Sequence, residues 1–103
     1  MRNFILLFLL LAAGFSAQAQ SLPADVKKVT DKYGCAACHA MDTRIVGPSW
    51  KQLAQKGYSA KKTAQLIRKP KPEDWPGYPA MAPIPAITDP EAKIIADWLK
   101  SIK

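Results

Sequence analysis

The sequence lacks the features that mark several common classes of protein. Its longest uncharged apolar run, Phe4–Phe15, has about a dozen residues, fewer than the roughly 20 that a membrane-spanning helix needs. It has no strand-like alternation of apolar and polar residues and no internal repeat. It also has no arginine-rich or aromatic-interleaved segment of the kind that binds nucleic acid. These absences count against a membrane-spanning protein, a β-rich fold and a nucleic-acid-binding protein. They favour a small all-α domain.

The N-terminus has the three parts of a secretory signal peptide. Arg2 supplies the positive charge, Phe4–Phe15 the apolar stretch, and Ala17-Gln18-Ala19 the small-residue cleavage signal. An uncleaved N-terminal anchor is the alternative, but the apolar stretch is short for one. We therefore expect residues 1–19 to be removed and residues 20–103 to form one domain, exported most naturally to a bacterial periplasm, without stable membrane insertion.

Acidic residues are scarce in the expected mature chain. Without Arg2, fourteen Lys and Arg stand against eight Asp and Glu, which gives a net charge of +6. A field of this sign favours acidic partners and speeds encounters with them. The 84 residues that follow the signal peptide make only a small core, so we expect a disulfide, a metal or a cofactor to stabilise it.

The rest of the chain predicts three to five helices. Apolar residues recur at helical spacing over 24–33, 59–69 and 88–102, and a short helix of one or two turns is expected over 50–56. Residues 70–90 differ, because they hold seven of the nine prolines and exclude a helix or a central strand. This segment is nevertheless apolar, so we expect an ordered loop that covers an apolar surface.

The stretch "CAACHAM" at residues 35–41 contains the chain's two cysteines and its one histidine, which are the candidate reactive or cofactor-binding residues. A thioredoxin-like dithiol would need a βαβ setting that the chain does not show. A zinc site lacks a second pair of ligands, and His39 directly follows Cys38, which makes tetrahedral closure difficult. A plain disulfide between Cys35 and Cys38 would leave His39 unexplained. The pattern C-x-x-C-H is instead typical of covalent haem attachment, with Cys35 and Cys38 as thioether anchors and His39 as an iron ligand.

Residues 24–103 resemble the class I cytochromes c, specifically the small bacterial carriers of the cytochrome c-551 type. The resemblance rests on "GCAACHAMDTRIVGPSWKQLA", on a Met within "AMAPIPAITDPEA", and on the closing "IADWLKSIK". It implies the all-α class I cytochrome c fold, in which the N- and C-terminal helices cross and a loop carries the second axial ligand to one covalently bound haem c.

The second axial ligand is expected to be Met81. The chain has no second histidine, and Met41 lies only two residues from His39 and cannot reach the opposite face of the haem. Met81 follows His39 by 42 residues, inside the proline-rich loop, and the resemblance also places the ligand there. Its spacing to the last helix departs slightly from the family pattern. Met81 as a packing residue, with an open or lysine-ligated iron, is the alternative.

The resemblance also implies neighbours of the haem. The Pro48 carbonyl would accept the Nδ1–H of His39, and Trp75 would donate its indole N–H to a haem propionate. Arg68 or Lys69 would offset propionate charge. The alternative is that Trp75 packs in the core and that the two cations are solvated.

We therefore expect a monomeric one-electron carrier that catalyses no reaction on a substrate. Its redox partners would present acidic surfaces: a membrane reductase on one side, and a terminal oxidase or haem nitrite reductase on the other. The docking cations would be drawn from Lys27, Lys28, Lys51, Lys56, Lys61, Lys62, Lys69 and Lys71. Two alternatives are a haem-based sensor or weak peroxidase with an open iron site, and a haem subunit locked in a larger reductase.

Overall fold

A computed structural model describes residues 22–102, and the expected signal peptide lies outside the described residues. The elements are all helical: α1 (Ala24–Tyr33), a 3₁₀ turn (Cys35–Ala37), α2 (Trp50–Gln55), α3 (Ala60–Arg68), a second 3₁₀ turn (Pro72–Asp74) and α4 (Asp89–Ser101). Within the described residues the only β pairing is an isolated antiparallel bridge between His39 and Arg44. The expected all-α class is confirmed.

Helix α1 ends where the sequence predicts. Gly34 adopts a left-handed conformation, with φ at 70°, and its N–H donates to the carbonyls near the end of the helix. The chain then turns at once into the short Cys35–Ala37 helix, which the sequence pattern did not predict. Gly34 thus places the cysteine segment directly against the end of α1.

Helices α2, α3 and α4 each begin at a side-chain cap. Ser59 caps α3, and Thr88 forms a capping box with Glu91 at the start of α4. Asp89 is the first residue of α4, and Pro90 follows it in the first turn. Ser49 and Gln52 form a second capping box at α2, which the S-x-x-Q spacing signals in the sequence.

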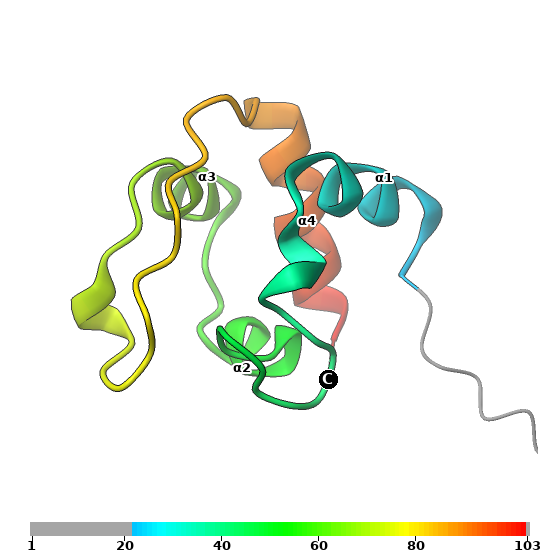
Figure 1. The fold of residues 1–103 in the computed structure, drawn as a ribbon. Helices are drawn as coiled ribbons and strands as arrows, with labels where there is room; N and C mark the ends of the chain where they lie inside the picture. Colours follow the sequence, from blue (N-terminus) through cyan, green and yellow to red (C-terminus); the bar gives the residue numbers. More distant parts are fainter. Residues whose placement is uncertain (1–21, 103) are drawn as a thin grey trace, which may run out of the picture.

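Helix α4 passes behind the centre of the molecule and packs against the other three helices (Figure 1). Ile95 and Leu99 of α4 are buried, while Ile94, Trp98 and the following Ile102 are partly buried at the edge of the core. These residues join apolar side chains from α1, α2 and α3 in a single cluster that includes Val29, Trp50 and Ala64. Ile95 and Leu99 of this cluster also line the cavity described below, so the core forms part of the wall of the site.

The proline-rich segment is ordered, as predicted, but one expectation for it is wrong. It contains the short 3₁₀ helix Pro72–Asp74, because proline is tolerated in the first turn, where its missing N–H is not needed. The remainder runs as an extended loop (yellow to orange in Figure 1). No helix in residues 22–102 is long and apolar enough to cross a bilayer.

Candidate functional site

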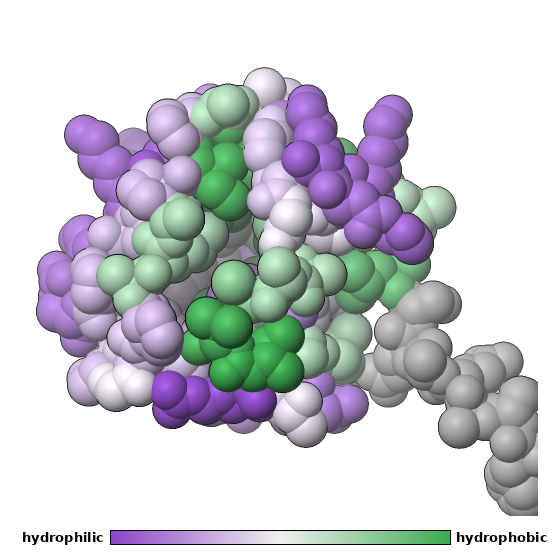
Figure 2. All heavy atoms as spheres, in the orientation of Figure 1, coloured by the Kyte–Doolittle hydropathy of each residue, from purple (hydrophilic) through white to green (hydrophobic). Residues whose placement is uncertain are grey.

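A cavity of about 400 Å³ opens between the cysteine segment and the proline-rich loop. Its lining includes all six residues that were assigned to the site from the sequence: Cys35, Cys38, His39, Pro48, Trp75 and Met81. The volume falls in the range of about 300–1,000 Å³ typical of ligand and cofactor sites. Figure 2 shows the hollow in this face, with apolar residues along its edge. The roles of the six residues toward a haem remain predictions.

The segment of residues 35–39 positions two thiols and the imidazole in one turn. The N–H groups of Cys38 and His39 both donate to the carbonyl of Cys35, at 3.2 and 3.1 Å. Cys35 and Cys38 are separate half-buried thiols and form no disulfide. Burial raises the pKa of the Cys35 thiol. A raised pKa is the opposite of what a redox-active dithiol needs, since its nucleophile must be a thiolate.

The ring of His39 is fixed by a hydrogen bond and by an aromatic neighbour. Its Nδ1–H donates to the Pro48 carbonyl at 2.6 Å, as predicted from the sequence. Because that nitrogen carries the proton, Nε2 keeps the lone pair that a metal ligand needs. The ring of Trp50 lies 4.9 Å from that of His39, between centroids, with a 37° angle between their planes. This arrangement gives His39 one tautomer and one orientation.

Gly47 gives the ring of His39 the space that it occupies. A Cβ atom on Gly47 would lie 2.8 Å from His39 Cε1 and 3.1 Å from Nδ1. With a side chain at position 47, the His39 ring or the backbone beside it would have to shift. The Gly47 N–H also donates to the Cys38 carbonyl at 2.7 Å, which holds the two segments together.

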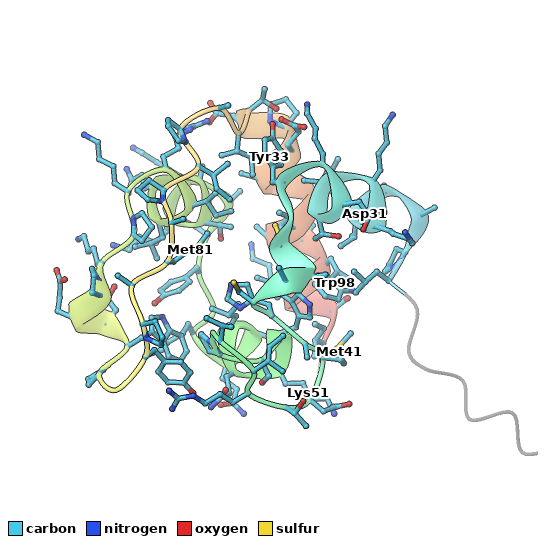
Figure 3. All side chains as sticks on the ribbon, viewed as in Figure 1. Asp31, Tyr33, Met41, Lys51, Met81 and Trp98 are labelled. Atoms are coloured by element: carbon cyan, nitrogen blue, oxygen red, sulfur yellow. The ribbon has the colours of Figure 1, made fainter. Side chains whose placement is uncertain are left out.

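Met41 and Met81 lie in different places. Met81 lines the cavity from the proline-rich loop, across the open centre from the cysteine segment (Figure 3). Met41 does not line the cavity and packs instead against the core cluster (Figure 3). The structure therefore brings Met81, and not Met41, to the same cavity as His39.

Two expected neighbours of a haem differ in their surroundings. Trp75 lines the cavity, and the Nζ of Lys56 lies 4.7 Å from the centre of its ring. Arg68 does not line the cavity, because its guanidinium donates to the Ile87 carbonyl at 2.8 and 3.1 Å and pairs with Asp89 at 2.7 Å. Arg68 thus ties α3 to the start of α4, which argues against a role beside a propionate.

The residues present fit a covalently bound haem. The wall of the cavity is mainly apolar, two thiols lie within it next to an oriented imidazole, and the glycine that the imidazole requires is present. A profile of the family described as Cytochrome c matches residues 23–103. The chain belongs to the cytochrome c family. Like other members, this cytochrome carries one covalently attached haem c and transfers electrons.

Relatives with this fold are small bacterial cytochromes. The chain is 35% identical over 103 residues to cytochrome c-551 of Stutzerimonas stutzeri, covering 96% of this chain and 97% of the relative. It is 37% identical over 99 residues to cytochrome c-552 of Nitrosomonas europaea, covering 91% and 87% of the two chains. The crystal structure of wild-type cytochrome c552 from N. europaea superposes with a TM-score of 0.64 and 32% identity, over 74% of this chain and 98% of that one. These matches place the chain among the small class I bacterial cytochromes c.

Proposed function

We propose that this cytochrome is a periplasmic one-electron carrier whose haem is attached through Cys35 and Cys38 and ligated by His39 and Met81. One observation carries the proposal: the two thiols, the oriented imidazole and the thioether all line one apolar cavity. When bound there, the haem iron supplies a site that gains and loses one electron. A His and Met ligand pair raises its potential relative to harder ligands, which suits a carrier.

The protein's own residues do the rest. Pro48 and Trp50 hold the imidazole in one orientation, so little rearrangement is needed when the charge of the site changes by one unit. The mainly apolar wall would keep water from a bound haem, and Met81 would take the ligand position that an external ligand or substrate would otherwise need. A site filled in this way supports electron transfer rather than catalysis on a substrate.

The rim of the cavity offers a contact surface for redox partners. Ile45 and Val46 are 49% and 47% exposed, and Val46 lines the cavity. Two lysines lie at the same site: Lys71 lines the cavity, and Lys56 lies over Trp75. Lys27 and Lys51 are instead paired with Asp31 and Asp42. We propose that acidic partners, a membrane reductase and an oxidase or haem nitrite reductase, approach near Lys56 and Lys71.

The test is the rate of electron transfer with small charged reagents in a stopped-flow instrument. Oxidation of the reduced protein by the anion ferricyanide should slow as salt rises, while oxidation by the cation tris(phenanthroline)cobalt(III) should accelerate. Lys56→Glu and Lys71→Glu should slow the ferricyanide reaction more than Lys28→Glu, an equal change of net charge on α1. Equal effects of the three substitutions would show that the cations at the cavity have no special part.

A second measurement separates a carrier from a haem sensor or weak peroxidase. If Met81 fills the axial position, the spectrum of the reduced protein should not change on exposure to carbon monoxide. Rapid binding of carbon monoxide would instead indicate an open iron site and would overturn the proposal.

A further inference from the structure

Arg44 connects the two sides of the cavity. Its backbone pairs with that of His39 in the antiparallel bridge, so it belongs to the wall that carries the imidazole. Its side chain extends to the proline-rich loop, where Nη2 donates to the Gly77 carbonyl at 2.6 Å. The guanidinium carbon also lies 3.8 Å from the centre of the Tyr78 ring. We call the contacts of Arg44 with Gly77 and Tyr78 the Arg44 clasp.

Tyr78 is held firmly enough to serve as the far end of the clasp. Its ring lines the cavity and packs edge-on against Trp75, with 5.7 Å between the ring centres and 81° between the planes. Its hydroxyl donates to Gln52 Oε1 at 3.4 Å. Gln52 in turn belongs to the capping box of α2, so Tyr78 is anchored to the helix that carries Trp50. A guanidinium stacked on this ring therefore contacts a fixed surface.

The clasp lies on one side of Met81 along the chain, and a second anchor lies on the other. Three residues after Met81, the N–H of Ile84 donates to the Ile67 carbonyl of α3 at 2.9 Å. Farther on, the Ile87 carbonyl accepts from Arg68. The loop is thus tied to α3 after Met81 and to the His39 wall before it. Without the contacts of Arg44, the loop before Met81 would be held by the packing of Tyr78 against Trp75 and by the hydrogen bond from Tyr78 to Gln52.

We propose that Arg44 is a positioning residue that holds the Met81 thioether in its ligating place by fixing the loop to the His39 segment. This inference rests on the proposed ligation by Met81. Arginine suits the role because its planar guanidinium can stack on an aromatic face and donate a directed hydrogen bond at the same time. A lysine ammonium cannot do both with the same geometry, so Arg44→Lys keeps the charge but weakens the clasp.

The test uses the mature holoprotein, exported and haem-loaded, in its oxidised form and measures the rate at which added imidazole replaces the methionine ligand. Arg44→Ala and Tyr78→Leu should each increase this rate by about tenfold. Each substitution removes the cation–π contact between the two side chains, and each also removes one hydrogen bond. Arg44→Lys should give an intermediate increase without changing the charge of the site. Lys61→Ala, which removes an exposed cation from α3, should leave the rate unchanged and serves as the charge control.

The sulfur-to-iron charge-transfer band in the red separates the two proposals. If the unsubstituted protein lacks this band, the ligation by Met81 is wrong. If the band is present and the Arg44 and Tyr78 variants all react with imidazole at the unsubstituted rate, the clasp is wrong and the ligation stands. If Arg44→Ala fails to take up haem, the imidazole rates of Arg44→Lys and Tyr78→Leu are compared with that of Lys61→Ala. Rates equal to that of Lys61→Ala would show that the clasp is wrong.

Discussion

At the scale of single residues, the position of the His39 imidazole depends on a hydrogen-bond acceptor at Pro48 and on the absence of a side chain at Gly47. Pro48 provides the carbonyl that accepts its Nδ1–H, and Gly47 provides the space into which its ring fits. The carbonyl contact was predictable from the family resemblance. The need for glycine was not, because it depends on the distance between two atoms that only the folded chain brings together.

Substitution of Gly47 should therefore disturb the site itself. In Gly47→Ala the new Cβ would meet His39 Cε1 at 2.8 Å, so the imidazole must move from the Pro48 carbonyl. We expect a lower yield of haem-containing protein and an altered haem spectrum, measured after periplasmic expression. Gly57→Ala is the matched control, because Gly57 has φ at 63° but a Cβ added there would meet no atom within 4 Å. It should lower the melting temperature through backbone strain and leave the spectrum unchanged.

At the scale of elements, a polar cluster joins the end of α1 to the start of α4. The Tyr33 hydroxyl donates to Glu91 Oε1 at 2.6 Å, and Lys32 pairs with Glu91 Oε2 at 2.9 Å. Glu91 also accepts from the N–H and hydroxyl of Thr88 in the capping box. The capping box is visible in the sequence, since Thr88 and Glu91 are three residues apart. The sequence did not predict the tie to Tyr33, because Tyr33 and Glu91 are 58 positions apart.

This cluster gives the stability of the protein a defined dependence on pH. The hydrogen bond from Tyr33, followed by that from Lys32, lowers the pKa of Glu91 from 4.5 to about 2. The folded protein stabilises the ionised Glu91 carboxylate, and the unfolded chain does not. The contribution of Glu91 to folding stability is therefore fully present above about pH 4.5. It is lost as the pH falls toward 2.

Denaturant unfolding of the holoprotein between pH 2 and 6 measures this contribution. Glu91→Gln should reduce stability most above pH 4.5, and the difference from the unsubstituted protein should shrink as the pH approaches 2. Asp97→Asn, which removes an exposed carboxylate paired only along α4, is the control. A difference between Glu91→Gln and the unsubstituted protein that stayed constant over this range would contradict the assignment.

At the scale of the whole molecule, local pattern predicted the helices better than it predicted their assembly. The bounds of α1 and α4 follow from Gly34 and Thr88, which act within one turn of each end. Met81 was assigned by elimination of Met41 and by the family resemblance, and not by local pattern, because proline-rich loops have no periodicity that fixes their path. The Arg44 clasp had no signal in the sequence, since it joins a turn to a loop 33 residues away.

The cavity also implies that the haem is part of the fold. About 400 Å³ lies between the core side of α4 and the proline-rich loop, in a chain too small to have a large core elsewhere. Replacement of both Cys35 and Cys38 by Ser should prevent covalent attachment and leave a protein with reduced helix content and no cooperative thermal transition. Far-ultraviolet circular dichroism checks this expectation. A cooperatively folded variant with the helix content of the holoprotein would show that the polypeptide folds without the haem.

The central claim is that His39 and Met81 ligate one covalently bound haem in a one-electron carrier. The most direct measurement is a visible spectrum combined with a redox titration of the full-length protein expressed with export, alongside Met81→Ala. We predict a low-spin spectrum with the sulfur-to-iron band when oxidised and a single one-electron transition. In Met81→Ala we predict loss of that band, a lower potential and binding of carbon monoxide when reduced. An unchanged band and potential in Met81→Ala would contradict the claim.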